Sequence, residues 1–218
     1  MGTFRESIGE FLFSPKQFTL THLVVIFFLI LFIQSSVVGL HRVVSSSMED
    51  TLLIGDVMLV VKTWYGFRAP FFKEPLATGC DLHRSDVLLF EYPIDPKQVF
   101  VKRCVAVGGD TVRISGKTLF VNGREISLPG NAKHADPSVI PKDQAKRDFL
   151  NPVVVPPRSL FVMGDNRDFS SDSRLWGCVS ERSLIGKAVI ILFSIDPNAP
   201  WTDLPRKLRT SRFFKDIR

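Results

Sequence analysis

The hydrophobic pattern of this chain changes once, near residue 40. From Gln17 to Leu40 there is no charged side chain, and residues 23–33 are all apolar. A helix that rises about 1.5 Å per residue needs roughly 20 residues to cross the hydrocarbon core of a bilayer. The pattern therefore predicts a single-pass membrane anchor at residues 19–40, preceded by a short cytoplasmic N-terminus at residues 1–18.

A cleavable signal peptide is the alternative interpretation, because an apolar run of 11 residues also fits the central region of such a leader. Two features favour a retained anchor: the preceding residues carry charges of both signs, and no well-spaced pair of small residues follows the run. Arg5 and Lys16 precede the run and Arg42 follows it. The positive-inside rule then favours residues 41–218 on the far side of the membrane.

After Leu40 the apolar residues occur in short β-branched or aromatic runs that are bounded by Gly, Pro and Asp. Such runs are typical of strands, and no long 3.6-residue period competes with them. We therefore predict a mainly β domain over residues 41–200, with a hairpin from Thr111 to Val121. The predicted strands are 57–63, 86–92, 99–107, 111–115, 118–122, 160–163 and 185–195.

Two segments do not follow this pattern. Residues 129–158 are rich in Pro and Lys, and we interpret them as an inserted or looping segment between two halves of the sheet system. Residues 201–218 hold six Lys or Arg and two Asp or Glu. They contain no nucleic-acid motif, so we expect a basic C-terminal tail that is solvated or lies on anionic lipid.

Composition narrows the class of protein. With 218 residues, 45% apolar and 23% charged, the chain is neither disordered, nor collagenous, nor a coiled coil, nor a polytopic membrane protein. Its three cysteines, Cys80, Cys104 and Cys178, are too few and too scattered for a disulfide framework. Without a C-x-x-C pair they also do not indicate a metal site.

Three polar groups are candidates for chemistry: the serines of residues 45–48, Lys102 inside an apolar strand, and the loop at residues 164–174. Each has an ordinary explanation, namely a Ser-rich turn, a lysine that snorkels at a strand edge, and a loop held by Asp–Arg pairs. Side chains alternate along a strand, so Lys102 and Arg103 lie on opposite faces and one of them must point towards the core or a cleft. A calcium loop at 164–174 is disfavoured because no Glu stands at its twelfth position.

In combination the three groups resemble one family. SSSMEDTL at residues 45–52 resembles the S-x-S-M-x-P-T-L box of the type I signal peptidases. The sequences RSDVLLF (84–90), VFVKRCVAVGGD (99–110) and GDNRDFSSDSRLWG (164–177) resemble the next three boxes, in the same order. The resemblance covers about residues 20–125 and 158–195.

This resemblance implies an all-β catalytic ectodomain of the signal-peptidase and LexA-like type. It implies a membrane-anchored serine endopeptidase that removes N-terminal signal peptides from exported preproteins, after small residues and without a metal or cofactor. The implied location is the bacterial cytoplasmic (inner) membrane, with the catalytic domain on the extracytoplasmic side. The implied partners are preprotein signal peptides and the lipid bilayer, with the export translocon as a further candidate and no nucleic acid.

By motif position, Ser47 resembles the nucleophile and Lys102 the general base. Lysine can act as a base only when neutral, and burial lowers its pKa by removing the water that stabilises the ammonium. The resemblance assigns supporting roles to further residues: Ser45 in the oxyanion hole, Ser170 orienting the base, and the pairs Arg103–Asp165 and Asp172–Arg174 bracing the site. It places Met48, Leu52, Leu89, Phe100 and Val101 along the substrate pockets.

The chain departs from the family pattern at several positions: Glu49 and Asp50 replace an apolar residue and Pro, Ser85 replaces Gly, Gly109 replaces Pro, and Phe169 replaces a polar residue. We expect the carboxylates of Glu49 and Asp50 to point to solvent. Two rival functions remain open. A self-processing LexA-like protease would need a soluble chain with a DNA-binding domain, and a non-enzymatic membrane-anchored envelope or secretion scaffold would leave the three motifs unexplained.

Overall fold

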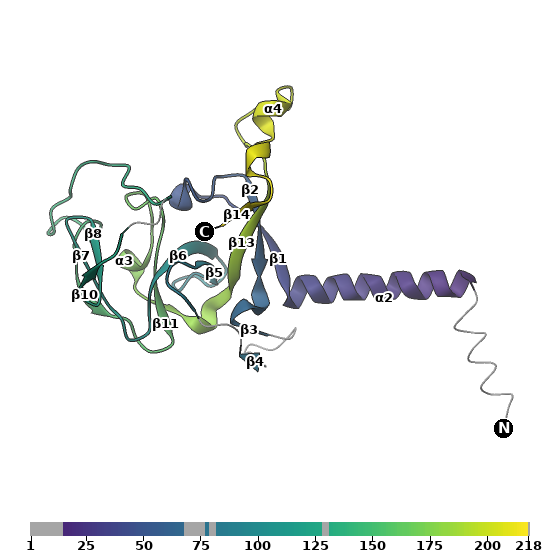
Figure 1. Cartoon of the computed structure of the whole chain (residues 1–218), viewed down its shortest axis with the longest axis horizontal. Helices are drawn as coiled ribbons and strands as arrows, with labels where there is room; N and C mark the ends of the chain where they lie inside the picture. Colours follow the sequence, from purple (N-terminus) through teal and green to yellow (C-terminus); the bar gives the residue numbers. More distant parts are fainter. Residues whose placement is uncertain (1–14, 68–76, 79–81, 128–130, 218) are drawn as a thin grey trace.

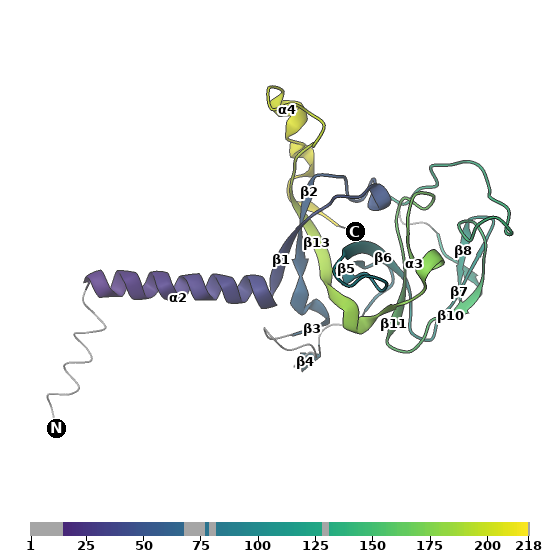
Figure 2. The ribbon, with the colours of Figure 1, turned by 180° about the vertical axis from the view of Figure 1, so that it is seen from behind.

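A single helix projects from a mainly β body (Figure 1), and this arrangement separates the chain into two parts. The computed structural model describes residues 15–67, 77–78, 82–127 and 131–217. Helix α2 (Pro15–Ser36) extends away from the body, and the view from behind shows the same separation (Figure 2). The apolar side chains of α2 from Leu20 to Ile33 are between 37% and 66% exposed.

Counting only the residues whose placement is described, no helix is both long enough and apolar enough to qualify as a membrane span. The predicted anchor and helix α2 share residues 19–36. The helix ends at Ser36, and residues 38–40 belong to the first strand of the body instead.

The body is built on one eight-stranded antiparallel sheet, in the order β1-β2-β13-β5-β6-β11-β12, with β14 added beside β13. Its strands are β1 (Val38–Arg42), β2 (Asp56–Val61), β5 (Val87–Glu91), β6 (Val99–Val107), β11 (Ser159–Met163), β12 (Val179–Ser180), β13 (Leu184–Ser194) and β14 (Lys215–Asp216). The short helices are η1 (Ser46–Met48), η2 (Lys62–Tyr65), η3 (Glu181–Ser183), η4 (Thr210–Arg212), α3 (Ser173–Trp176) and α4 (Leu204–Lys207). In Figure 1 this sheet curls so that β5 and β6 lie inside the body.

A second sheet covers the end of the body that is remote from α2 (Figure 1). It has the order β10-β7-β8-β9, with β7 (Thr111–Ser115), β8 (Thr118–Val121), β9 (Arg124–Glu125) and β10 (Leu150–Val154). The predicted hairpin from Thr111 to Val121 is confirmed, because β7 and β8 pair across a turn that contains Gly116 with a φ of +55°. A two-stranded pair, β3 (Gly66–Phe67) with β4 (Ala77–Thr78), completes the described strands.

The centre of the sheet is buried on both faces. Val87 and Leu89 of β5 pack into one apolar cluster, whereas Leu88 and Phe90 pack into another on the opposite face. This explains why the sequence of β5 is a continuous apolar run rather than an alternating one. A third cluster lies between the second sheet and strands β6 and β11.

The predicted strands agree with the structure to within two residues, and β6 and β7 match at both ends. Mainly β is therefore the correct fold class. Residues 131–158 are more ordered than the predicted looping segment, because they contain β10, which pairs with β7. Pro152 hid this strand from the sequence pattern, since proline is compatible with a strand mainly at a sheet edge, where β10 lies.

The prediction of a basic tail at residues 201–218 is wrong for the described residues 201–217. They form α4, η4 and β14, and β14 pairs with β13 at Ile190 and Ile191. Lys207 and Arg212 are buried, with exposed fractions of 6% and 8%. The domain therefore continues beyond residue 200, to the last described residue.

Candidate active site

Ser47 lies in a tight turn that follows the first strand of the large sheet. The 3-10 turn η1 begins after Ser45, which has an extended backbone and accepts a hydrogen bond from the Ser47 N–H at 3.3 Å. Serine is favoured at such a cap position because its hydroxyl satisfies a backbone donor that the turn leaves open. Ser47 itself is 6% exposed, so the turn presents its hydroxyl to the interior of the site.

Lys102 reaches the same point from strand β6. It pairs with Leu88 in the register between β5 and β6, and its side chain is only 3% exposed. Its Nζ lies 2.5 Å from the Oγ of Ser47, although 55 residues separate the two along the chain. The two groups are therefore in direct hydrogen-bonding contact.

Burial lowers the pKa of Lys102 from 10.5 to about 8, because the ammonium loses its hydration. Asp172 and Asp165 act in the opposite direction, and Arg174 adds to the lowering. A lysine with such a pKa is partly neutral near physiological pH. The neutral amine can accept the proton of Ser47 as the hydroxyl attacks a carbonyl, which is the chemistry of a nucleophile with an adjacent base.

Arg103 points away from Lys102, as strand alternation predicts, and pairs with Asp165. The Nε and Nη2 of Arg103 donate to the two oxygens of Asp165 at 2.8 and 2.6 Å, and both residues are almost fully buried. Thr51 donates to the same carboxylate at 2.5 Å. A buried carboxylate with several charge-assisted hydrogen bonds holds its neighbours in one geometry, and here these neighbours flank both Ser47 and Lys102.

The loop after β11 holds the main chain of the Ser47 turn. The Asn166 N–H donates to the Ser47 carbonyl oxygen at 3.1 Å, and the Asn166 side chain donates to Ser46 O and to Glu49 Oε2. Sequence reasoning singled out the motif that contains Asn166 but gave this residue no role. Its role depends on a contact across 119 positions of sequence, which no local pattern encodes.

The carboxylate of Asp172 closes this loop. It accepts hydrogen bonds from the Arg174 guanidinium and from the Gly164 N–H. Burial acts to raise the pKa of Asp172, but the Arg174 charge, the Gly164 N–H and the nearby Ser170 hydroxyl outweigh it and lower the pKa. Asp172 therefore remains ionised and paired, as the resemblance implies.

The orienting role of Ser170 stays a prediction. Within the described residues, its buried Oγ makes no hydrogen bond to Lys102 that meets strict geometric criteria. The hydroxyl lies instead between Gly164 and the Asp172 carboxylate. The Ser47 carbonyl oxygen lies against the same glycine.

The two groups expected to form the oxyanion hole are joined to each other. The Ser47 N–H donates to Ser45 Oγ, although Ser45 is exposed and is free to rotate towards solvent. Rotation of the Ser45 hydroxyl would release the Ser47 N–H, which leaves two hydrogen-bond donors beside the nucleophile. Donors arranged in this way stabilise a developing oxyanion.

The apolar residues expected along the pockets are divided between two places. Met48, Leu52 and Leu89 are at most 3% exposed and belong to the core behind the Ser47 turn, with Val101 packed against them. Phe100 lies on the other face of β6, with its ring centre 5.9 Å from Lys102 Nζ. Its ring stacks on Tyr92 at 4.4 Å, a contact that sequence reasoning did not find.

Glu49 and Asp50 point partly to solvent, with side chains 42% and 49% exposed, and both contact Lys133. The Lys133 backbone pairs with Asn166 in the catalytic loop. The segment that was predicted to loop therefore supplies one positive charge, which offsets part of the charge of the two carboxylates beside Ser47. Among the described residues, no cluster of three or more His, Cys, Asp or Glu could hold a metal ion.

Comparison with known proteins gives consistent matches. The sequence model of the family described as signal peptidase, peptidase S26, matches residues 17–193. The chain is 33% identical to the signal peptidase I of Pseudomonas fluorescens over 199 residues, which cover 78% of this chain and 69% of the relative. It is 32% identical to the signal peptidase I of Pseudomonas aeruginosa over 208 residues, covering 83% and 73% of the two chains.

A crystal structure of a signal peptidase I from Enterococcus faecalis V583 aligns with 50% of this chain and 97% of its own, at 28% identity and a TM-score of 0.39.

Replacing Lys102 with Met should stabilise the fold at neutral pH while removing the base. The wild-type protein holds the amine where burial opposes its charge, and the shift from 10.5 to about 8 corresponds to about 3 kcal/mol. Between these pKa values the unfolded chain binds the proton and the folded chain does not, so wild-type stability rises with pH. In urea unfolding, the free energy of unfolding of the variant should therefore exceed that of the wild type. The difference should be largest below pH 8 and smaller near pH 10.5. An equal gain at both pH values would contradict the argument.

Replacing Gly164 with Ala should misplace the nucleophile. A Cβ at this position would overlap the Ser47 carbonyl oxygen and the Ser170 Oγ. Because small misplacements in a site can cost about 10²-fold in rate, we expect acylation of Ser47 by an activated ester to slow by this order. Gly116→Ala is the control, since its Cβ meets open space and the strain of its positive φ stays in the turn between β7 and β8. Equal acylation rates in the two variants would contradict the assigned geometry.

Proposed function

The chain belongs to the signal peptidase family, peptidase S26, and on this premise we propose that it is an endopeptidase that removes N-terminal signal peptides from exported preproteins. The observation that carries the proposal is the contact of 2.5 Å between Lys102 Nζ and Ser47 Oγ. A scaffold without catalytic activity would gain nothing from a buried amine with a lowered pKa, which lowers stability.

The reaction follows from this pair. Neutral Lys102 takes the proton from Ser47 Oγ while the oxygen attacks the carbonyl carbon of the scissile bond. The oxyanion that forms is stabilised by the Ser47 N–H and the Ser45 hydroxyl. Lys102 then gives its proton to the departing amine, which leaves an acyl-enzyme. Lys102 next takes a proton from a water molecule while the water oxygen attacks the acyl carbon. The ester bond to Ser47 Oγ then breaks, Lys102 returns the proton to Ser47 Oγ, and the signal peptide leaves with a new carboxyl terminus.

We propose that the substrate lies as an extended strand beside the dyad, with small residues at positions −3 and −1 from the cleaved bond. Two exposed segments support this placement: Val44, which precedes the nucleophile turn and is 79% exposed, and Val99 at the start of β6, which is 43% exposed. An added strand can bind to such backbone through hydrogen bonds, while shallow pockets read alternate side chains. Phe100 and Val101 follow Val99 towards Lys102 and suit the walls of these pockets.

The direct test is incubation of the purified full chain with a preprotein that carries an Ala-x-Ala site, followed by sequencing of the new N-terminus. We expect cleavage after the second Ala. Ser47→Ala and Lys102→Ala should each lower the rate by about 10²–10⁴-fold or more, with the fold retained. Lys102→Arg should be equally inactive, because a guanidinium does not act as a base.

Full activity of either alanine variant would favour the scaffold instead. Cleavage of the chain by itself, without cleavage of the preprotein, would favour the LexA-like alternative.

We further propose that residues 17–36 anchor the protein in a bacterial cytoplasmic membrane, with the body on the extracytoplasmic side. The absence of charge from Gln17 to Leu40 supports this placement, as does the exposure of the apolar side chains of α2. A bilayer would cover this apolar surface, which water does not favour.

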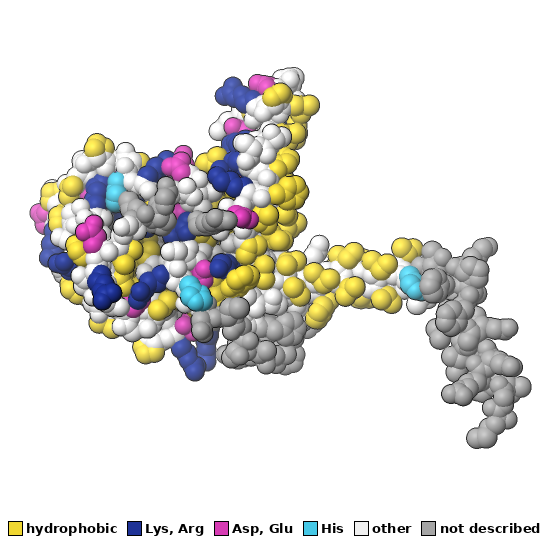
Figure 3. Space-filling view, viewed as in Figure 1, with side chains coloured by type: hydrophobic (Ala, Val, Ile, Leu, Met, Phe, Trp, Pro, Cys, Tyr) yellow, Lys and Arg dark blue, Asp and Glu magenta, His cyan; other side chains and the backbone are white. Residues whose placement is uncertain are grey.

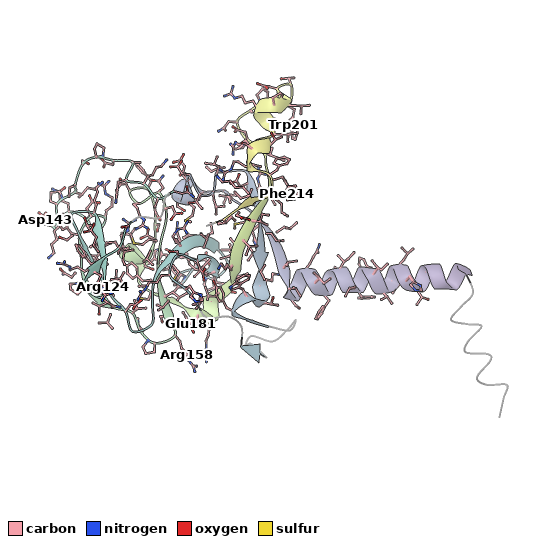
Figure 4. The ribbon with its side chains drawn as sticks, viewed as in Figure 1. Arg124, Asp143, Arg158, Glu181, Trp201 and Phe214 are labelled. Carbon is pink, nitrogen blue, oxygen red and sulfur yellow. The ribbon has the colours of Figure 1, made fainter. Side chains whose placement is uncertain are left out.

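A second apolar surface supports the same placement. The C-terminal projection, residues 196–214, carries Trp201, Leu204 and Phe214 with exposed fractions of 66%, 53% and 70%. In Figure 3 apolar side chains follow the edge of this projection that faces the direction in which α2 extends. Figure 4 places Trp201 and Phe214 along this edge. A membrane crossed by α2 would therefore meet the projection.

Two charges in the centre of α2 should release the protein from membranes. Each costs about 2.5–3.5 kcal/mol at the middle of a bilayer, so Ile26→Asp with Ile30→Asp should move the chain from the pellet to the supernatant in alkaline carbonate. The matched control is Ile94→Asp with Val139→Asp, two exposed apolar residues of the body. Release of the wild-type protein by carbonate would contradict the anchor.

A further inference from the structure

The C-terminal segment reaches the chain that follows the nucleophile. Arg212, at the end of η4, is 8% exposed, and its Nε and Nη2 donate to the carboxylate of Asp56 at 2.6–3.2 Å. Asp56 is fully buried at the start of β2. Such a forked ion pair is among the strongest and most directional contacts that a protein can form.

This ion pair fixes both ends of the segment between the Ser47 turn and β2. The same Nη2 of Arg212 donates to the Thr51 carbonyl oxygen at 2.9 Å. The Asp56 carboxylate also accepts the Leu53 N–H at 2.8 Å. One guanidinium therefore binds both ends of residues 51–56, which come directly after the nucleophile turn.

Thr51 connects this segment to the base. Its Oγ1 donates to Asp165 at 2.5 Å, and Asp165 pairs with Arg103, the neighbour of Lys102 on β6. The backbone of Thr51 thus contacts Arg212, and its side chain contacts the ion pair beside the base. Thr51 therefore links the segment after the nucleophile turn to the ion pair beside the base, and Arg212 contacts it through its backbone.

We propose that Arg212 is a positioning residue of the peptidase site, which holds Thr51 and thereby sets the distance between the Ser47 turn and Lys102. This inference rests on the proposed peptidase function. In the described structure Arg212 does not contact the dyad, and of the residues that it binds, Thr51 is the one whose side chain reaches Asp165 beside the base. Loss of the guanidinium should therefore slow the chemical step and leave the affinity for substrate almost unchanged.

The experiment compares Arg212→Gln with Arg206→Gln in the full chain. Arg206 is an exposed arginine of the same segment, and within the described structure its side chain makes no hydrogen bond or ion pair. For Arg212→Gln we expect kcat for preprotein cleavage, per folded molecule, to fall at least tenfold, with KM within about twofold of the wild-type value. Arg212→Lys should recover part of the rate, because it restores the charge opposite Asp56 but not the fork.

A double-mutant cycle with Thr51→Val separates positioning from stability. If Arg212 acts through Thr51, adding Arg212→Gln to Thr51→Val should lower kcat by less than about threefold more, because both changes break the same connection. If the fold-loss of kcat in the double variant equals the product of the losses in the two single variants, the proposal is overturned. A lower melting temperature with an unchanged kcat per folded molecule would also overturn it, since it would show a purely structural ion pair.

A second readout separates this inference from the proposed function. The rate of Ser47 acylation by an activated ester needs no preprotein, so it reports the geometry of the dyad alone. We expect the same tenfold loss for Arg212→Gln and no loss for Arg206→Gln. If the wild-type protein acylates but does not cleave preproteins, the proposed substrate is wrong, while the acylation rates still decide the role of Arg212.

Discussion

The structure depends on one constraint: Lys102 must remain dry and yet touch a hydroxyl. Water would stabilise its ammonium and return the pKa towards 10.5, where the amine is almost never neutral at physiological pH. A strand that is buried on both faces provides the dry environment, which is why the base lies on β6 in the middle of the sheet. The burial that activates the lysine also destabilises the fold, so the rest of the site has to hold it in place.

This constraint explains why the carboxylates around the dyad are paired. Asp172 and Asp165 both raise the pKa of Lys102, which opposes its role as a base. Each is bound by an arginine, Arg174 and Arg103 respectively, which orients the carboxylate and offsets part of its charge. The loop gains rigidity from these ion pairs, while Arg174 contributes to the lowering of the pKa of Lys102. Structural support and tuning of the base are therefore properties of the same groups.

Sequence reasoning succeeded where the relevant physics is local. Alternation along a strand separated Lys102 from Arg103, and the glycine of the turn predicted the hairpin of β7 and β8. It did not succeed where the deciding partner is distant. Arg212 belongs to a stretch whose composition suggested a solvated tail, because a count of charges cannot show a buried Asp56 that lies 156 residues away. Lys133 was missed for the same reason, since its acidic partners follow the nucleophile in another part of the chain.

The distances along the chain have a consequence for assembly. Three contacts close long loops of the chain. The partners are 55 residues apart for Ser47 and Lys102, 114 for Thr51 and Asp165, and 156 for Asp56 and Arg212. Each closure costs chain entropy before it gains contacts, so no part of the chain can form this site early or alone. Arg212 is synthesised after the residues that it contacts, among them Thr51 and Asp56. With Arg212 as the proposed positioning residue, Ser47 and Lys102 reach their final distance only after this segment has packed against β2.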